Sequence, residues 1–144
     1  IMTIADLYHN EERLRNLADL ANLYRVAKSD GIVSPEEMLF LTKIAKRYDV
    51  EDEDFKKILK SPDDYPTIGY YEFDDRVERF YDMMKLISDH NKKSYQEVRV
   101  LRKIVTGLSF SVKKVDDIVE AASKIDFQNC QFEEFKDKIF AVCH

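Results

Sequence analysis

One stretch of the chain recurs sixty positions later without a gap, and this repeat constrains the fold more than any other feature. Sliding residues 20–59 onto 80–119 places apolar residues on apolar residues and one serine–glutamate pair on another. The matched positions are Leu20 and Phe80, Leu23 and Met83, Ala27 and Ile87, Ser34 and Ser94, Glu37 and Glu97, Leu41 and Leu101, and Ile44 and Ile104. The sequence therefore predicts one helical unit used twice.

Apolar residues in the first repeat and before it recur every three or four positions, which is the period of a helix. Asn10 can cap a helix that runs to about Ser29, and Gly31 can take the left-handed conformation that ends such a helix. The apolar face of this predicted helix comprises Leu14, Leu17, Ala18, Ala21, Tyr24 and Ala27. The spacing and the end signals together predict a long first helix.

A capping box should start the next helix in each repeat. Ser34 and Glu37 have the required spacing, and Pro35 suits the first helical position. Ser94 and Glu97 repeat the box sixty residues on. Each repeat is therefore expected to be a helical hairpin whose second helix begins at a reciprocal side-chain cap.

Further apolar stripes of helical period predict the remaining helices. They are Met38, Leu41, Ile44, Ala45 and Tyr48; Phe55, Ile58 and Leu59; Phe73, Val77, Phe80, Met84 and Ile87; Val98, Leu101, Ile104, Val105 and Leu108; Val112, Val115, Ile118, Val119 and Ala122; and Phe132, Phe135, Ile139 and Val142. Gly107 should mark a helix end, Ser111 should cap the helix after it, and the last helix should span about 131–142. Residues 61–72 hold two prolines and a glycine, and they form the connection between the repeats.

The predicted fold class is all-α: a compact bundle of six or seven helices built from two pseudo-symmetric repeats, 20–59 and 80–119. At 144 residues the chain suits a single domain, 1–144. With 44% hydrophobic and 35% charged residues, it has the composition of a globular helical protein. No alternating strand pattern competes with the helical one.

Charge and cysteine content limit the partners and the compartment. A formal net charge of -5, without a concentrated basic face, argues against a nucleic-acid partner. No long apolar run predicts membrane insertion or a secretion signal. Cys130 and Cys143 match no metal or disulfide pattern, so two free thiols in a reducing, cytoplasmic compartment are expected, with a disulfide between them as the alternative.

Residues 29–37 read Ser-Asp-Gly-Ile-Val-Ser-Pro-Glu-Glu, an apolar stripe follows them, and residues 44–48 read Ile-Ala-Lys-Arg-Tyr. In these residues the first hairpin resembles the TerB-like family of bacterial tellurite-resistance and stress-response proteins. The sixty-residue repeat strengthens the resemblance, so that it covers nearly the whole chain. It implies a bundle of about seven helices, a role in stress response, and association with complexes at the membrane periphery.

The resemblance also implies a divalent cation held by acidic residues at the turns of both hairpins. Carried onto this sequence, the implied ligands are Asp30 and Glu37 from the first hairpin and Glu97 from the second. Asp89 joins them as the acidic residue that remains in the second turn. Carboxylate clusters of this kind prefer Mg²⁺, Ca²⁺ or Mn²⁺.

The second turn departs from that pattern, and a structural interpretation of the acidic residues stays open. Its residues 88–94 read Ser-Asp-His-Asn-Lys-Lys-Ser, so His90 and Asn91 stand where the first turn has aspartate and glycine. Glutamates in capping boxes need no ligand, and Asp30 can satisfy turn amides. The first turn does not match an EF-hand calcium loop, because the first and third loop positions would be Val26 and Lys28, which supply no oxygen ligand.

A metal-free adaptor for another protein is the alternative function. The connection between the repeats carries Tyr65, Ile68, Tyr70 and Tyr71, and aromatic residues of this kind either anchor a partner or pack on their own domain. Catalysis is not expected, because the sequence has no glycine-rich phosphate loop, no nucleophile elbow and no signature around either cysteine. The sequence therefore favours a non-enzymatic module with an unidentified protein partner.

Overall fold

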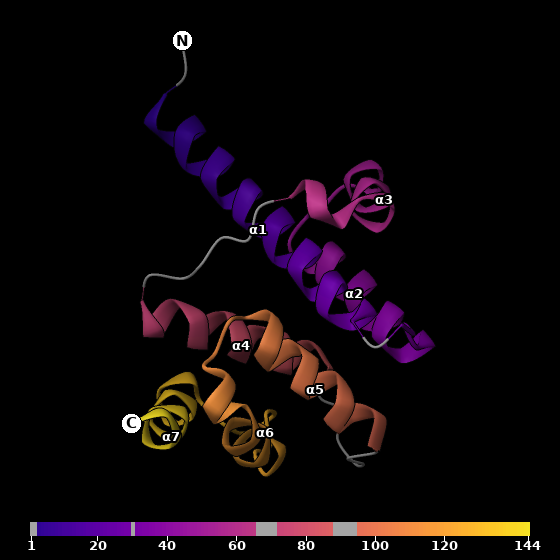
Figure 1. Ribbon diagram of the computed structural model, residues 1–144. Helices are drawn as coiled ribbons and strands as arrows, with labels where there is room; N and C mark the ends of the chain where they lie inside the picture. The colour runs from indigo at the N-terminus through magenta and orange to yellow at the C-terminus, as the bar shows by residue number, and fades with distance from the viewer. Residues whose placement is uncertain (1–2, 30, 66–71, 88–94) are drawn as a thin grey trace. The chain divides into compact units, whose positions relative to one another are not determined.

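The computed structural model describes residues 3–29, 31–65, 72–87 and 95–144, without the side chains of 5–9, 87 and 95–97 (Figure 1). These residues form seven α-helices, two short 3-10 helices and no β-strand. The elements are α1 (Ile4–Lys28), α2 (Pro35–Arg47), α3 (Asp52–Lys60), η1 (Pro62–Asp64), α4 (Phe73–Ile87), α5 (Tyr95–Gly107), η2 (Val112–Lys114), α6 (Val115–Ser123) and α7 (Phe132–Cys143). The all-α prediction is confirmed.

The chain divides into two compact units, residues 1–68 and 69–144. The division falls in the proline-containing stretch 61–72 that the sequence analysis assigned to the connection between the repeats. The first unit contains α1 to η1, and the second contains α4 to α7. The single-domain organisation and the two-fold pseudosymmetry of the packing stay predictions.

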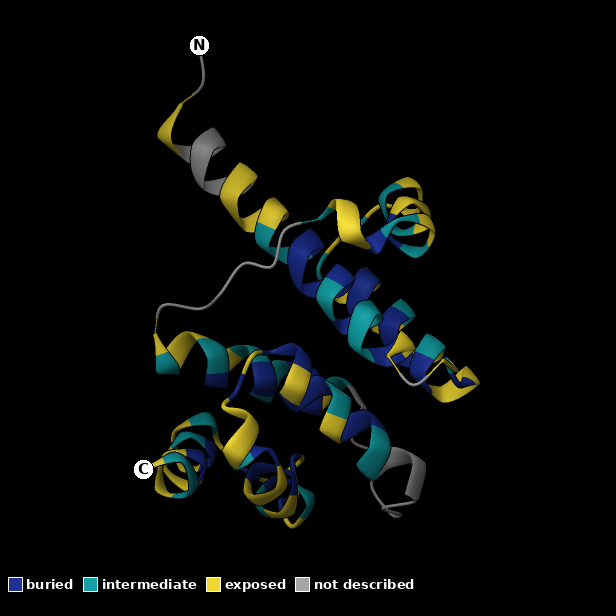
Figure 2. Ribbon diagram, in the orientation of Figure 1, coloured by how far each residue is buried: buried dark blue, intermediate teal, exposed yellow. Residues whose placement is uncertain are grey.

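Helix α1 begins earlier than predicted. It starts at Ile4, so Asn10 lies inside the helix and does not cap it. An asparagine costs only a few tenths of a kcal/mol in a helix interior, and no glycine or proline lies between residues 4 and 9 to stop the helix. Leu14, expected in the core, is 56% exposed. Figure 2 shows the same contrast along the helix, with exposed residues near its start and buried residues in its second half.

The core of the first unit forms where α2, α3 and η1 contact α1. Its buried apolar residues are Leu17, Ala18, Leu20, Ala21, Leu23, Ala27, Phe40, Leu41, Ile44, Ala45 and Ile58. A salt bridge of 2.8 Å between Arg13 and Asp54 joins α1 to α3 at the surface. These contacts make α1 the central helix of its unit, because each of the other elements packs against it.

Arg25 of α1 holds the segment that follows α3. Its Nη1 donates to the carbonyl oxygens of Pro62 at 2.6 Å and Tyr65 at 3.0 Å, and its Nη2 donates to Asn22 Oδ1 at 3.3 Å. Hydrogen bonds with a charged partner stabilise more than neutral ones. The residue pattern does not predict this contact, because any residue type supplies a backbone acceptor.

Both α2 and α5 end in the same kind of turn, sixty residues apart. Asp49 and Ser109 take left-handed backbone angles, with φ of 54° and 65°. The next amide reaches back to the helix in each case, from Val50 to Ala45 at 2.8 Å and from Phe110 to Val105 at 3.4 Å. This is the hydrogen bond of a Schellman cap. Gly107 is the last residue of α5, as predicted, but the left-handed position is Ser109.

Aromatic side chains form much of the core of the second unit. Phe135 of α7 is fully buried, and its ring centroid lies 5.4 Å from Phe80, 5.4 Å from Tyr81 and 5.3 Å from Phe127. Such tilted and edge-on pairs add to the free energy of burial. The unit is also held by contacts of α6 with α5 and α7, and of α4 with α7.

The start of the sixth helix differs from the prediction. Residues 112–114 form η2, and α6 starts only at Val115. Ser111 precedes η2 and makes no side-chain cap bond, and Val112 is 86% exposed although its stripe predicted burial. The tighter 3-10 winding has three residues per turn, so it shifts Val112 off the buried face of the helix that follows.

The two cysteines are free, and their positions exclude the alternative of a disulfide between them. Cys130 precedes α7 and Cys143 is its last residue, so this 12-residue helix separates them. A helix of that length spans about 18 Å, far beyond the Cα separation of a disulfide. None of the described helices has the length and apolar character to cross a membrane.

Candidate functional site

The turn between α1 and α2 is the part of the predicted site that the structure describes. Gly31 has φ of 85°, and its amide donates to the carbonyl of Lys28 at 2.8 Å. An added Cβ at this glycine would meet no atom within 4 Å. Its left-handed backbone, predicted from the sequence, is therefore the reason that a glycine suits this turn.

The predicted capping box at the start of α2 is confirmed. The backbone N–H of Glu37 donates to Ser34 Oγ at 3.1 Å, and the backbone N–H of Ser34 donates to Glu37 Oε1 at 3.4 Å. Pro35 occupies the first helical position. Glu37 is only 2% exposed and Ser34 only 8%. The Glu37 carboxylate thus has a structural role in which it satisfies a buried backbone amide.

The other predicted cation ligands lie outside what the structure describes. Asp30 and Asp89 are outside the described residues, as are His90 and the Ser94 partner of the second capping box. Glu97 lies in α5, but its side chain is not described. The described residues contain no group of three or more histidine, cysteine, aspartate or glutamate side chains that could hold a metal ion.

The outer face of α2 differs in character from its inner face. The buried residues Phe40, Leu41, Ile44 and Ala45 lie on one side. Leu39 lies on the opposite side and is 56% exposed, and Lys43 and Lys46 follow it one and two turns later, also exposed. Neither lysine forms an ion pair with a described residue. We call Leu39, Lys43 and Lys46 the α2 outer stripe, a feature that the sequence analysis did not single out.

The tyrosine-rich connection is described only at its start. Tyr65 is half-buried, and its backbone carbonyl oxygen accepts a hydrogen bond from Arg25. Ile68, Tyr70 and Tyr71 lie outside the described residues. The partner surface predicted there stays a prediction.

The two thiols lack the environment of a reactive cysteine. Burial raises the pKa of Cys130, and the nearby carboxylate of Glu134 raises it further. Burial also raises the pKa of Cys143, against the opposing charges of Lys114 and Arg76. Nucleophilic cysteines depend on a lowered pKa, so neither thiol has that activation.

Comparisons with protein-family models, characterised proteins and solved structures find no match. The resemblance to the TerB-like family therefore rests on the residues of the sequence quoted above, and function has to be argued from the described side chains.

Proposed function

We propose that the chain is a non-enzymatic helical adaptor whose α2 outer stripe binds an acidic, amphipathic segment of a partner protein. The observation that carries the proposal is the exposure of Leu39 beside two lysines that form no ion pair with a described residue. The whole chain has a net charge of -5, whereas the outer face of α2 carries Lys43 and Lys46 against the single acidic residue Glu36.

The chemistry of the stripe defines the partner. Leu39 offers apolar surface whose burial is worth about 25 cal/mol per Å². Lys43 and Lys46 lie at the edge of that surface, where opposite charges on a partner speed association and fix its register. An amphipathic helix with apolar residues on one face and aspartate or glutamate beside them meets both requirements.

Photo-crosslinking tests this proposal at the residue that carries it. A benzoylphenylalanine at position 39 is expected to crosslink to a partner whose crosslinked peptide, sequenced by mass spectrometry, is acidic and amphipathic. The same group at position 53 in α3, where Glu53 is exposed, is the matched control on the same unit.

Charge reversal supplies the second arm of the experiment. Lys43→Glu together with Lys46→Glu should abolish the crosslink from position 39, while helical circular dichroism stays unchanged. Equal crosslinking from position 53, or a crosslink that survives the charge reversal, would refute the proposed surface.

A second candidate, which follows from the TerB-like resemblance, is a stress-response module that holds Mg²⁺, Ca²⁺ or Mn²⁺ between its hairpins through Asp30, Glu37, Asp89 and Glu97. The bond from Ser34 N–H to Glu37 Oε1 supports it, because at 3.4 Å this bond is longer than a normal N–H···O bond. Such a module would act in peripheral membrane complexes.

We propose the cytoplasm as the compartment for either function. The two free thiols support this, since a reducing environment keeps cysteines unpaired.

A further inference from the structure

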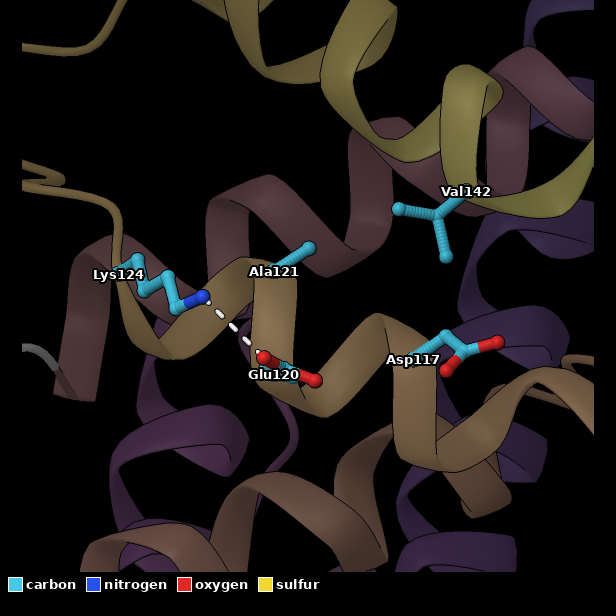
Figure 3. A pocket seen from close by; sticks show the side chains of 5 residues that line it. All are labelled: Asp117, Glu120, Ala121, Lys124 and Val142. Atoms are coloured by element: carbon cyan, nitrogen blue, oxygen red, sulfur yellow. Dashed lines mark hydrogen bonds and ion pairs between the residues drawn. The ribbon is translucent and has the colours of Figure 1, made fainter.

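A pocket lies between α6 and α7, apart from the α2 outer stripe. Its lining consists of Asp117, Glu120 and Ala121 from α6, Lys124 just after the end of α6, and Val142 from α7, and its volume is about 320 Å³ (Figure 3). That volume is within the range of sites that bind small molecules. The pocket opens to solvent, so a bound group would enter without displacing either helix.

The apolar and charged parts of the lining are separated. Ala121 and Val142 are half-buried and provide the apolar surface, with Val142 on the α7 side facing α6 in Figure 3. At one end, Lys124 Nζ lies 3.2 Å from Glu120 Oε1, so these two charges offset each other. At the other end, Asp117 forms no hydrogen bond or ion pair with a described residue.

This arrangement leaves one carboxylate without an ion-pair partner among the described residues, beside an apolar surface. Asp117 lies in the first turn of α6, at the positive end of the helix dipole. Residues 117 and 124 are seven positions apart, which separates their backbones by about 10 Å along the helix axis. The ligand that complements the lining is therefore a cation with a short apolar body.

We propose that this pocket binds a primary alkylammonium group, with its alkyl chain on Ala121 and Val142 and its ammonium at Asp117. Anions are disfavoured, because two of the three charged side chains are carboxylates. Quaternary ammonium groups are recognised by aromatic cages, and the lining has no aromatic residue. A primary ammonium also donates the hydrogen bonds that the Asp117 carboxylate can accept.

Amide chemical shifts in an n-butylamine titration at neutral pH and constant ionic strength test the proposal, because the amine is then fully protonated. We expect saturable shifts at residues 117, 121 and 142, with a dissociation constant on the order of millimolar. Asp117→Asn should weaken binding about threefold to fivefold, the effect of one exposed ion pair. Unchanged amide shifts elsewhere would show that the variant is folded.

Asp116→Asn is the matched control, because it removes the same charge one residue away, from a side chain that pairs with Arg102. It should leave the affinity unchanged, and n-butanol should give no saturable shift. Equal weakening by both substitutions would show diffuse charge attraction and overturn the proposal. The absence of saturation with n-butylamine up to tens of millimolar would also overturn it.

A second ligand, N-acetyl-lysine N-methylamide, shows whether the bound alkylammonium group belongs to a lysine side chain or to a small free amine. If it shifts the same amides with similar affinity, the site accepts lysine side chains of other polypeptides. If only n-butylamine binds, the ligand is a small free amine. Either result supports an alkylammonium site.

Discussion

Replacing Ser34 by alanine removes the oxygen that accepts the backbone N–H of Glu37 at 3.1 Å. The loss of a serine cap costs about 0.5–2 kcal/mol. Because Ser34 is only 8% exposed, water replaces the lost acceptor poorly, and we expect a loss in the upper half of that range, about 1.5 kcal/mol. The reciprocal bond from Ser34 N–H to the Glu37 carboxylate survives, since it uses the backbone.

Urea unfolding followed by helical circular dichroism measures this loss as a lower midpoint with an unchanged slope. Ser29→Ala is the matched control in the same turn. Its hydroxyl donates to the carbonyl of Val26 at 2.6 Å, but that carbonyl also accepts the Ser29 amide, so the substitution leaves no group unsatisfied. Ser34→Thr should restore most of the stability, because threonine also caps a helix with a hydroxyl oxygen and adds no charge beside the buried Glu37. A Ser34→Ala effect no larger than that of Ser29→Ala would refute the reasoning.

Three further predictions concern Arg25, Ser109 and Lys136. Arg25→Ala should lower the free energy of unfolding by about 2 kcal/mol, and hydrogen exchange should show faster exchange near residues 62–65. Ser109→Gly should raise the free energy of unfolding by about 0.5–1 kcal/mol, because glycine adopts φ of 65° without strain. The urea midpoint should rise accordingly. Lys136 Nζ in α7 donates to Asp74 Oδ2 in α4 at 3.4 Å. This hydrogen bond and the charge of Asp74 raise the pKa of Lys136, so the folded state holds this proton more tightly. That stabilisation is full below about pH 10.4, the unfolded value, and is lost as pH rises through the higher folded pKa. Urea midpoints measured at alkaline pH should therefore fall less in Asp74→Asn than in the parent chain.

Local signals in the sequence predicted the helices well where caps and breakers are strong. Gly31, Pro35 and the Ser34–Glu37 pair act within a few residues of one another, so their geometry depends little on the rest of the fold. The predicted start of α1 was wrong, because an asparagine such as Asn10 is tolerated inside a helix as well as at its cap.

Contacts between distant residues were beyond the sequence pattern. Arg25 bonds to backbone carbonyls 37 and 40 residues away, and any residue type supplies such an acceptor. The exposure of Leu14 and Val112 depends on which elements pack against them, and periodicity reports only that a face is apolar. The left-handed backbone at position 109 was not predicted, because the residue there is a serine and not a glycine.

The candidate site was predictable only as far as its local geometry. The Ser34–Glu37 box followed from residue spacing, whereas convergence of Asp30, Asp89 and Glu97 with Glu37 depends on how two hairpins pack. The pocket between α6 and α7 depends in the same way on the approach of Val142 to a helix that begins nearly thirty residues earlier.

The adaptor account holds that Glu37 serves its helix cap and that the chain needs no cation. Thermal unfolding of metal-stripped protein, titrated with Mg²⁺, Ca²⁺ and Mn²⁺, tests this claim most directly. A cation bound only by the folded state would add about 2.7 kcal/mol of stability at one hundred times its dissociation constant. Glu37→Gln is the informative variant, since glutamine also completes a capping box but carries no charge. The account predicts no saturable shift with any of the three ions. A saturable rise that Glu37→Gln abolishes would contradict it and establish the cation-binding module instead.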